Sequence, residues 1–385
     1  GLTAATLVNQ TMLGPLTVAS LRFFTPAREA NQMRAYFAGV LRLLVQATFV
    51  LLSLAGLLGI GLWLSGNDKW LGLALMALAF ALFTGYNSTL DGMQNAARQR
   101  VIVAWHDGLA VWLRFFGALA LVSILGTYSQ VAMLGYVLAA IVVLSSQFFF
   151  FRQRIIRLSA VDPETTPSAI SLWAKKMVSY GWPFAVWGIF TWVRVVSDRW
   201  ALQIFASTYE VGLYAVLYQL GYYPISVLSG MLSQVVLPIF YAKAGSGTEP
   251  ARLLQVYRLN VLLIVATVCL TLSLGTVAFF FHKWIFDLFV APEYHIASRW
   301  LPWMVLSGGL LAAAEFAAIA LLSGMHTQKL IVPKVVTALI GMLLNLAGAW
   351  WFGLAGIVLA GLVFSCVYFA WVMLLIWKTL PHPRP

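Results

Sequence analysis

Long apolar segments of about 20 residues recur along the whole chain and constrain its fold more than any other feature. Hydrophobic residues make up 62% of the sequence and charged residues only 9%, whereas a soluble globular domain carries roughly 25% charged residues. Polar groups are therefore too few to cover the apolar surface in water. Continuous runs of this length predict transmembrane helices and exclude the short alternating strands of a β-barrel. We predict an all-α polytopic membrane protein.

Eleven membrane-spanning helices are predicted from these runs. They cover residues 1–21, 36–64, 70–93, 101–126, 131–151, 177–204, 209–240, 257–281, 299–324, 333–353 and 355–377. Several of these spans are longer than a bilayer requires, so we expect tilt or extension beyond the membrane.

The basic residues divide the loops between two sides of the membrane. Lys and Arg are retained on the cytoplasmic side, so the side richer in them faces the cytoplasm. That side carries Arg28, Arg34, Arg98, Arg100, Arg152, Arg154, Arg157, Lys175, Lys176, Lys243, Arg252, Arg258, Lys329, Lys334, Lys378 and Arg384. The opposite side carries Lys69, Lys283 and Arg299. The C-terminus is therefore predicted to be cytoplasmic, and topology rather than nucleic-acid binding explains the net charge of +12.

Two pairs of short motifs indicate an internal repeat. The segment GLTAA at Gly1 resembles GLYAV at Gly212, and LDGMQ at Leu90 resembles LSGMH at Leu322. The members of each pair fall on corresponding spans with the same predicted orientation. This pattern describes a parallel repeat about an axis along the membrane normal.

The repeat divides the chain into two six-helix lobes. Residues 1–151 are predicted to form the N-terminal lobe with helices 2–6 of twelve, and residues 177–385 the C-terminal lobe with helices 7–12. Residues 152–176 are predicted to be a cytoplasmic linker between the lobes. The first lobe shows one span fewer than the second, so we expect a further helix before Gly1 in the natural protein.

Arg114 lies in the middle of the apolar segment DGLAVWLRFFGALALV, residues 107–122. It lies about midway between Arg100 and Gly126, near the membrane midplane at about 1.5 Å per helical residue. A charge there costs about 2.5–3.5 kcal/mol and usually faces the interior of a helix bundle. Asp107 lies two turns earlier on the same helix face. Arg114 is therefore predicted either to pair with Asp107 or to line a polar cavity.

The segment WVRVVSDRW carries three further charges. Arg194 and Asp198 are four residues apart and share a helix face, so Arg194 either pairs with Asp198 or lines the cavity. Arg199 lies at the outer end of the span, where its side chain can snorkel. Both arginines are candidate contacts for an anionic group, because guanidinium forks match phosphate oxygens. Asp107 and Asp198 are predicted to balance the buried cations or to couple to an ion.

Three other ionisable residues complete the candidate set. Glu315 is a carboxylate inside the span 299–324, and we predict that it either couples to a proton or cation or pairs with an arginine of the other lobe. Asp91, a further candidate for charge balance, lies near a cytoplasmic helix end, where we expect it to be solvated. Arg22 is expected to snorkel or to line a cytoplasmic vestibule.

Motifs of well-known soluble enzymes are absent from the sequence. It contains no GxxxxGK phosphate loop, no HExxH metal motif and no GxSxG nucleophile elbow. The five histidines lack metal-binding spacing, and no loop is long enough for a soluble catalytic domain. We predict that the chain is not an enzyme and needs no metal or cofactor, while coupling to H⁺ or Na⁺ stays open.

Several segments share their patterns with one family of transporters. They are SDRWALQIFASTYEVGLYAVLYQL (197–220), with Asp198, Arg199, Gly212 and Tyr214; IFDLFVAPEYHIASRWLPWMVLS (285–307), with Tyr294, Ala297 and Leu301; PKVVTALIGMLLNLAGAWWFGLAGIVLA (333–360), with Pro333, Asn345, Gly353 and Gly356; and SLRFFTPARE at the end of the first span. These segments resemble the Wzx-type polysaccharide flippases of the multidrug/oligosaccharidyl-lipid/polysaccharide (MOP) exporter superfamily. The resemblance covers nearly the whole chain.

The resemblance implies two six-helix lobes around a cationic central cavity in the bacterial inner membrane. It implies that undecaprenyl-pyrophosphate-linked oligosaccharide, such as an O-antigen unit, moves from the cytoplasmic to the periplasmic leaflet by alternating access. Arg114, Arg194, Arg22 and Arg199 are then the candidate pyrophosphate contacts. Membrane lipids and the polysaccharide polymerase and chain-length machinery would be partners, and nucleic acid would not. The family's first helix borders the opening between the lobes, so its absence leaves part of the cavity wall unassigned.

Two other functions stay open. A multidrug or cation antiporter of the same superfamily would need an acidic cavity, and a clearly negative cavity potential would favour it. An intramembrane glycan ligase or polymerase would usually need a sizeable outer loop, whereas the longest outer loop here is the short stretch 282–298. A structure with one closed lobe rather than two would favour this second alternative.

Overall fold

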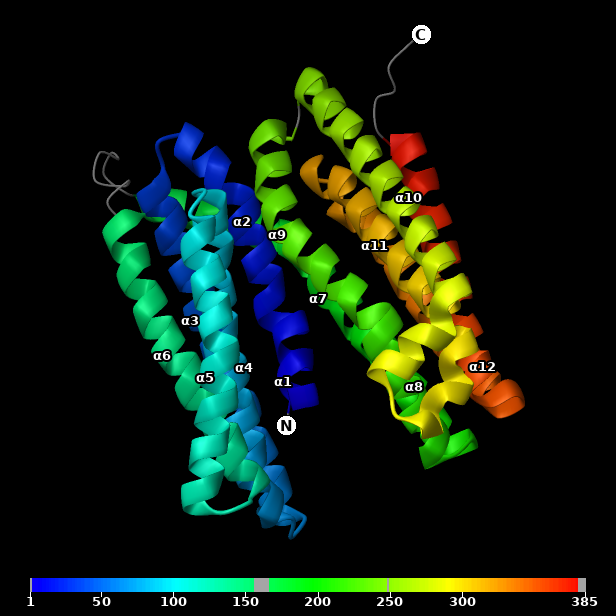
Figure 1. Ribbon diagram of the computed structural model, residues 1–385. Coiled ribbons are helices and arrows are strands. Elements are labelled where there is room, and N and C mark those ends of the chain that lie inside the picture. Colours follow the sequence, from blue (N-terminus) through cyan, green and yellow to red (C-terminus); the bar gives the residue numbers. More distant parts are fainter. Residues whose placement is uncertain (1, 156–165, 248, 380–385) are drawn as a thin grey trace. The chain divides into compact units, whose positions relative to one another are not determined.

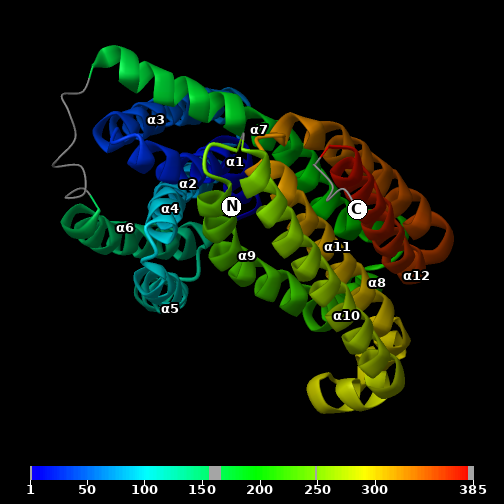
Figure 2. The same ribbon diagram turned by 90° about the horizontal axis from the view of Figure 1, so that it is seen from above.

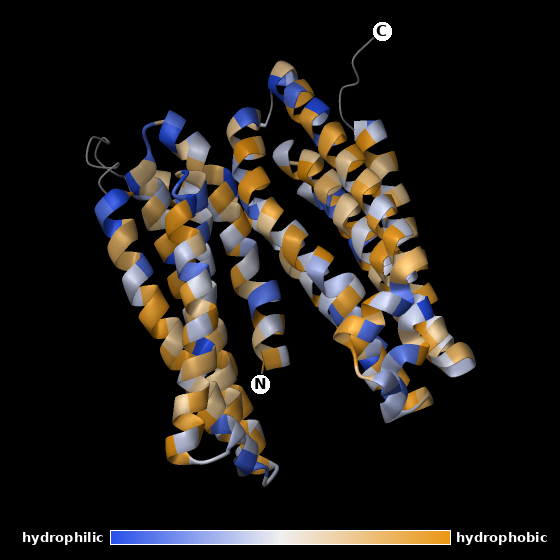
Figure 3. Cartoon of the chain, in the orientation of Figure 1, coloured by the Kyte–Doolittle hydropathy of each residue, from blue (hydrophilic) through white to orange (hydrophobic). Residues whose placement is uncertain are grey.

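The computed structural model describes residues 2–155, 166–247 and 249–379, apart from the side chain of Asp68. Every regular element within these ranges is helical (Figure 1). Eight of the described segments are long and apolar enough to cross a membrane. Apolar residues extend along most of each long helix, and hydrophilic residues gather toward helix ends (Figure 3). The predicted all-α polytopic membrane fold is thus confirmed.

Each of the eleven predicted spans overlaps a described helix. The helices are α1 (Leu2–Val8), a π-helical turn (Asn9–Leu13), α2 (Gly14–Glu29), α3 (Met33–Leu64), α4 (Leu71–Ala96), α5 (Arg100–Leu125), α6 (Ser129–Arg154), α7 (Pro167–Phe205), α8 (Thr208–Leu217), a second π-helical turn (Tyr218–Tyr222), α9 (Tyr223–Ala244), α10 (Pro250–Phe289), α11 (Leu301–Ser323) and α12 (Ile331–Thr379). Short 3₁₀ turns lie at Asp68–Trp70, Pro292–Trp300 and Thr327–Leu330. The last two predicted spans both belong to α12.

The chain divides into two compact units, Gly1–Gly188 and Ile189–Pro385. The boundary between the units falls inside α7 rather than in the predicted linker. Because α7 begins at Pro167, the second half of the segment 152–176 is helical. Residues 156–165 of that segment lie outside the described residues. Each unit is considered by itself below.

One helix is central to the packing of each unit. In the N-terminal unit α4 contacts α2, α3, α5 and α6. In the C-terminal unit α11 contacts α9, α10 and α12, and most of its side chains are buried. In the view from above, α2, α5 and α6 lie next to α4, and α9, α10 and α12 lie next to α11 (Figure 2). Side chains of α4 and α11 are therefore the ones best placed to form a protein interior.

Both units contain the same local backbone irregularity. In each, a π-helical turn interrupts the helix, and a proline follows two residues after its last residue: Pro15 after Leu13, and Pro224 after Tyr222. The extra residue of a π turn shifts the helix face and often marks a functional position. The proline has no N–H to donate, so it fits where the regular hydrogen-bond ladder is already broken. The predicted motif pairs also fall on corresponding elements: residues 2–5 in α1 and 212–216 in α8, and residues 90–94 in α4 and 322–326 at the end of α11 and in the turn that follows.

Aromatic packing joins α2, α3 and the first half of α7 within the N-terminal unit. The rings of Phe23 and Tyr36 each meet Trp173 edge to face, with centroids 6.2 and 6.3 Å apart. The Tyr36 hydroxyl donates to the Ser20 carbonyl at 2.6 Å, and the Trp173 indole N–H donates to Gln32 Oε1 at 3.0 Å. Each buried aromatic polar group thus has a partner, as burial requires.

The break inside α12 is held by a carboxylate from α8. Gly353 has a φ of 55°, a left-handed conformation that glycine adopts without steric cost. The next residue, Leu354, begins the second half of α12, and its backbone N–H donates to Glu210 Oε2 at 2.6 Å. Ser207 in turn caps α8 by accepting a hydrogen bond from the Glu210 N–H at 3.2 Å. Glu210 therefore serves as the cap of a helix distant in sequence.

We expect Glu210→Ala to lower the free energy of unfolding by about 1–3 kcal/mol, because a buried N–H at Leu354 loses its charged acceptor. Thermal unfolding of the full chain in detergent measures this change. Glu293→Ala, which removes an exposed carboxylate of the same unit, is the control and should change the midpoint little. An unchanged midpoint for the Glu210 variant would contradict the capping role.

Candidate functional site

The side chain of Arg194 lies in the interior of the C-terminal unit. Its guanidinium carbon is 4.2 Å from the ring centroid of Phe364 in α12. Gly341, also in α12, leaves room for the arginine stem, because a Cβ atom there would lie 3.3 Å from Arg194 Cδ. The face of an aromatic ring attracts a cation without neutralising its charge. The structure thus holds Arg194 in place while keeping it positively charged.

Asp198 follows Arg194 by one helical turn, yet no ion pair joins their side chains among the described contacts. Asp198 Oδ2 accepts a hydrogen bond from the Tyr214 hydroxyl at 2.7 Å, and Oδ1 accepts one from the Arg199 backbone N–H at 2.6 Å. Asp198 is only 9% exposed, so these donors replace water around the carboxylate. A direct Arg194–Asp198 ion pair is thus not among the described contacts, while the two side chains interact electrostatically within the same cavity.

A small cavity lies beside these residues, with about 30 Å³ of space that water can occupy. Its lining consists of Arg194, Val195, Asp198, Tyr214, Tyr218, Tyr222, Met304, Ser307, Asn345, Ile357 and Gly361. Tyr218 and Tyr222 belong to the π-helical turn, and their rings stack with centroids 5.0 Å apart. The cavity therefore combines one cation and one carboxylate with several hydroxyl groups and an amide.

Hydrogen bonds between polar side chains join the helices around the cavity. Asn345 of α12 donates through Nδ2 to Ser197 Oγ of α7 at 2.9 Å. The hydroxyls of Ser307 in α11 and Ser365 in α12 are 3.2 Å apart. All four side chains are buried, so these bonds fix the relative positions of α7, α11 and α12.

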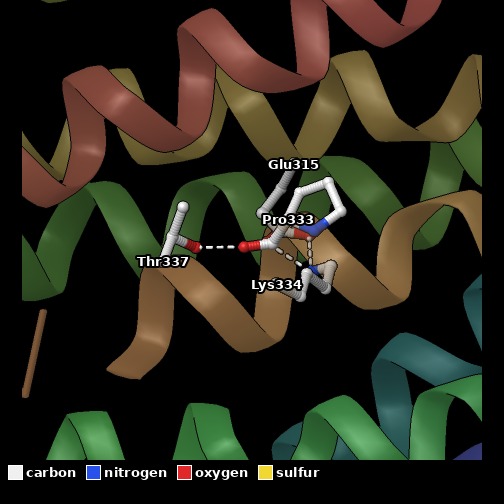
Figure 4. Close-up of polar contacts among 4 residues, drawn as sticks. All are labelled: Glu315, Pro333, Lys334 and Thr337. Carbon is white, nitrogen blue, oxygen red and sulfur yellow. Dashed lines mark hydrogen bonds and ion pairs between the residues drawn. The ribbon is translucent and has the colours of Figure 1, made fainter. Parts of the chain in front are cut away.

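Glu315 pairs with Lys334 inside the same unit (Figure 4). Lys334 Nζ lies 2.7 Å from Glu315 Oε1 and 3.0 Å from Oε2. The lysine side chain is 13% exposed and the glutamate side chain 48% exposed. Lys334 also lies 5.3 Å from the ring centroid of Tyr368. The predicted pairing of Glu315 with an arginine of the other lobe is therefore wrong: its partner is a lysine that hydropathy assigns to a cytoplasmic loop.

Arg199 is exposed, as its position at the outer end of the span predicts. Its guanidinium carbon lies 5.5 Å from the ring centroid of Tyr218, one of the tyrosines that line the cavity. Arg199 therefore stands at the margin of the cavity rather than within its lining.

The other predicted charges form a second group, in the N-terminal unit. Arg114 is partly buried with its guanidinium carbon 5.3 Å from the Phe80 ring centroid, and its Nε atom has no hydrogen-bond partner in the described structure. Asp107 is exposed and lies within electrostatic range of both Arg114 and Asp91. Asp91 is partly buried and accepts a hydrogen bond from Gln147. The expectation of a solvated Asp91 is therefore wrong.

Arg22 is completely buried in α2, with no exposed surface. Its expected position at a solvent-filled vestibule, or with a side chain snorkelling to the interface, is not what the structure shows. Among the described residues, no group of three or more His, Cys, Asp or Glu side chains could hold a metal ion.

Sequence reasoning missed the tyrosines and the lysine of the C-terminal unit. Tyr214, Tyr218 and Tyr222 recur at intervals of four residues, which is the spacing of one helix face. This stripe begins 16 residues after Asp198 and ends two residues before Pro224. That spacing was the available signal. Lys334 gave no comparable signal, because it follows Pro333 at a helix start, where basic residues are common.

Several solved structures with a similar fold are described as transporters. The chain resembles the MATE transporter VcmN from Vibrio cholerae in its bent form with a TM-score of 0.73 and 14% identity, over 97% of this chain and 86% of that one. It resembles the eukaryotic MATE transporter AtDTX14 with a TM-score of 0.65 and 15% identity, over 98% and 85% of the two chains. A MOP superfamily transporter from Pyrococcus furiosus gives 0.68 and 14%, over 98% and 86%.

These similarities extend over nearly the whole chain, so the protein has the fold of the MATE transporters of the MOP superfamily. No protein-family model and no curated protein matches its sequence.

We expect Tyr214→Phe to lower the free energy of unfolding by about 1–3 kcal/mol, because the buried Asp198 carboxylate loses a hydrogen-bond donor. Tyr218→Phe is the matched control, since Asp198 accepts no hydrogen bond from Tyr218 among the described contacts. Thermal unfolding of both variants in detergent provides the comparison. Equal midpoints for the two would show that the Tyr214–Asp198 bond contributes nothing specific.

Proposed function

We propose that the protein is a flippase that moves undecaprenyl-pyrophosphate-linked oligosaccharide from the cytoplasmic to the periplasmic leaflet. The observation that supports the proposal is the set of contacts around Arg194 in its cavity. This arginine is held by the ring of Phe364, and the nearest carboxylate, Asp198, is satisfied by other donors. A cation in a partly buried site without a paired carboxylate favours an anionic ligand.

The cavity lining suits the two polar parts of such a substrate. A guanidinium group binds phosphate oxygens through two parallel N–H donors, which fits the pyrophosphate. The hydroxyls of Tyr218, Tyr222 and Ser307 and the amide of Asn345 line the same space and can exchange hydrogen bonds with sugar hydroxyls. The apolar tail would stay in the bilayer, beside helices whose outer faces are apolar.

Lys334 supplies a second cation to the interior of the same unit. Glu315 would hold it in the absence of substrate, and its release would leave the carboxylate free to take up a proton or Na⁺. The charges of the N-terminal unit would contribute to the passage of the headgroup: Arg114 as an anion contact, with Asp91 and Asp107 as its balance. Arg199 would contact the anion at the cavity margin. Arg22, being buried, would act by positioning.

The same proposal places the protein in the bacterial inner membrane. Its C-terminus would be cytoplasmic because the ends of α2, α6 and α9 share a basic character with the C-terminal tail. The polysaccharide polymerase and chain-length machinery would receive the product.

A multidrug or cation antiporter is the second candidate. The fold favours it, because one similar structure is described as a multidrug resistance MATE family transporter. The charges do not make the net acidic interior that a cation antiporter would need, because Arg194 and Lys334 stand beside equal numbers of carboxylates, Asp198 and Glu315. Another similar structure is described as having a binding pocket of reverse polarity that suggests a different function. An intramembrane ligase or polymerase is less favoured by the two compact units.

Translocation of lipid-linked oligosaccharide in reconstituted vesicles tests the role of Arg194. We expect Arg194→Ala to lower the rate at least about 30-fold, because loss of a buried charged contact costs about 2–5 kcal/mol. Arg299→Ala is the matched control: it removes an arginine of the same unit that is exposed and lies 5.5 Å from the Trp300 ring centroid. A full rate in the Arg194 variant, or efflux of cationic dyes by the parent protein with no sugar-lipid translocation, would overturn the proposal.

Exchange of the two charges tests the Glu315–Lys334 pair. The double variant Glu315→Lys with Lys334→Glu keeps an ion pair but moves the cation from α12 to α11. We expect it to unfold near the parent midpoint and to translocate about tenfold more slowly, because the cation no longer stands where the substrate anion passes. Parent-like stability together with parent-like transport would show that the pair is structural only.

A further inference from the structure

An apolar pocket lies between α2, α3 and the first half of α7 in the N-terminal unit, apart from the arginine and tyrosine cavity. It contains about 250 Å³ of free space. Its two longer walls are formed by Leu43, Ala47 and Val50 of α3 and by Val178, Trp182 and Ala185 of α7. The π-helical turn and the start of α2 line a third side. An apolar cavity of about 150 Å³ already binds a small apolar molecule, so this space is large enough for part of a longer one.

The pocket is closed at one end by direct packing of α3 on α7. A Cβ atom at Gly39 would lie 3.4 Å from the backbone nitrogen of Ala174, so the two helices touch there, and α7 runs along α3 in the view from above (Figure 2). Beyond this contact the helices diverge and leave the pocket between them. Val50 and Trp182 are 55% and 43% exposed, so the pocket opens at the surface of the unit. The neighbouring exposed residue of α3 is Phe49, which indicates that the opening faces lipid.

The length of the pocket matches one leaflet of a bilayer. At about 1.5 Å per residue, α7 rises about 12 Å from Met177 to Ala185, and α3 rises about 10 Å from Leu43 to Val50. The hydrocarbon core of a whole bilayer is about 30 Å thick, so each leaflet contributes about 15 Å. Both walls begin near the helix ends that the basic residues assign to the cytoplasm. This length and position favour a single alkyl chain of the cytoplasmic leaflet over a transmembrane helix.

Two basic residues, Arg42 of α3 and Lys175 of α7, lie toward the same end of the pocket. Arg42 precedes Gln46 by four residues and Lys175 precedes Val178 by three, so each basic residue lies one helical turn from a residue of the pocket wall. Both side chains are exposed, and neither belongs to an ion pair in the described part of the chain. Lys176, by contrast, lies 4.5 Å from the ring centroid of Trp173.

Acidic residues are nearly absent from the helices that form the pocket. Glu29, in the last turn of α2, is the one acidic residue in α2, α3 and the part of α7 before Gly188. It lies about 20 Å along α2 from Leu16, the last α2 residue of the pocket. These helices therefore offer an anionic headgroup two cations and no carboxylate beside the pocket. Basic groups of this kind on the cytoplasmic side of transmembrane helices bind anionic lipid headgroups.

We infer that the pocket binds an anionic phospholipid of the cytoplasmic leaflet, with one acyl chain between α3 and α7 and its phosphate beside Arg42 and Lys175. The guanidinium group donates two parallel hydrogen bonds to phosphate oxygens, and the ammonium group adds a second positive charge. The acyl chain fills the space where α3 and α7 diverge, so the bound lipid stabilises the N-terminal unit. The inference does not depend on the proposed substrate. The alkyl chain of a sugar-linked lipid is a different occupant, which the experiment separates.

Native mass spectrometry of the full chain in detergent tests the site without measuring transport. The probes are phosphatidylglycerol and phosphatidylethanolamine with the same acyl chains. We expect one saturable site with higher affinity for phosphatidylglycerol. The double variant Arg42→Gln with Lys175→Gln should weaken this binding about tenfold or more, because each basic residue near an anionic headgroup contributes to affinity. Ala47→Phe fills the pocket without changing any charge and should weaken the binding by a similar factor. The thermal unfolding midpoint of each variant without added lipid reports whether it folds.

Two controls match these variants, and both should bind phosphatidylglycerol as the parent does. Arg28→Gln with Lys176→Gln removes two exposed cations of the same unit, and Val45→Phe enlarges an exposed residue of α3 outside the pocket. Equal parent affinity for the two phospholipids would overturn the inference. So would parent-like binding in both site variants, or displacement of phosphatidylglycerol by an equal concentration of undecaprenyl phosphate, which would assign the pocket to a polyprenyl chain. Translocation of sugar-lipid is not measured, so the two proposals fail or stand separately.

Discussion

The high free energy of an uncompensated charge in a membrane interior governs the polar architecture of this protein. Each buried charge needs hydrogen bonds, an opposite charge or a polarisable surface. The C-terminal unit uses all three in different places. Asp198 accepts hydrogen bonds, Glu315 pairs with Lys334, and Arg194 lies on the ring of Phe364. Because these solutions differ, the three sites respond differently to a ligand. At Glu315 and Lys334 an ion pair must be broken before a new partner can bind.

The fold places these groups among packed helices. In each unit the central helix, α4 or α11, meets the largest number of neighbouring helices, so its polar residues contact other protein rather than lipid. The π-helical turns also place polar side chains in these interiors. In the C-terminal unit the turn stacks Tyr218 on Tyr222 along the cavity wall, and in the N-terminal unit it contains Asn9, whose amide donates to Thr84 of α4 at 2.9 Å. The repeat therefore reproduces a backbone irregularity while the side chains it presents differ.

Hydropathy was sufficient to predict the helices, because a span needs only a continuous apolar run, and no competing element satisfies the backbone in lipid. The same argument identified Arg194 and Asp198 as buried charges. It failed where neighbours distant in sequence decide the outcome. Lys334 was assigned to a loop because it follows a polar stretch, yet packing directs it toward Glu315. Burial of Arg22 and the tyrosine side of the cavity depend on how helices meet, which periodicity within one helix does not encode.

A protein with the proposed function must release what it binds, and the aromatic support of Arg194 suits this requirement. A guanidinium held on a ring face keeps its N–H edge directed elsewhere, so an anion can approach that edge while the ring contact persists. No ion pair among the described contacts has to be broken, because the Asp198 carboxylate in the same cavity is held by Tyr214 and by the Arg199 backbone N–H. At Lys334 the opposite holds: an incoming anion must replace Glu315, and the freed carboxylate then seeks a cation. An interior with both arrangements can bind an anion at Arg194. At Lys334 the displacement of Glu315 then signals that the anion is present.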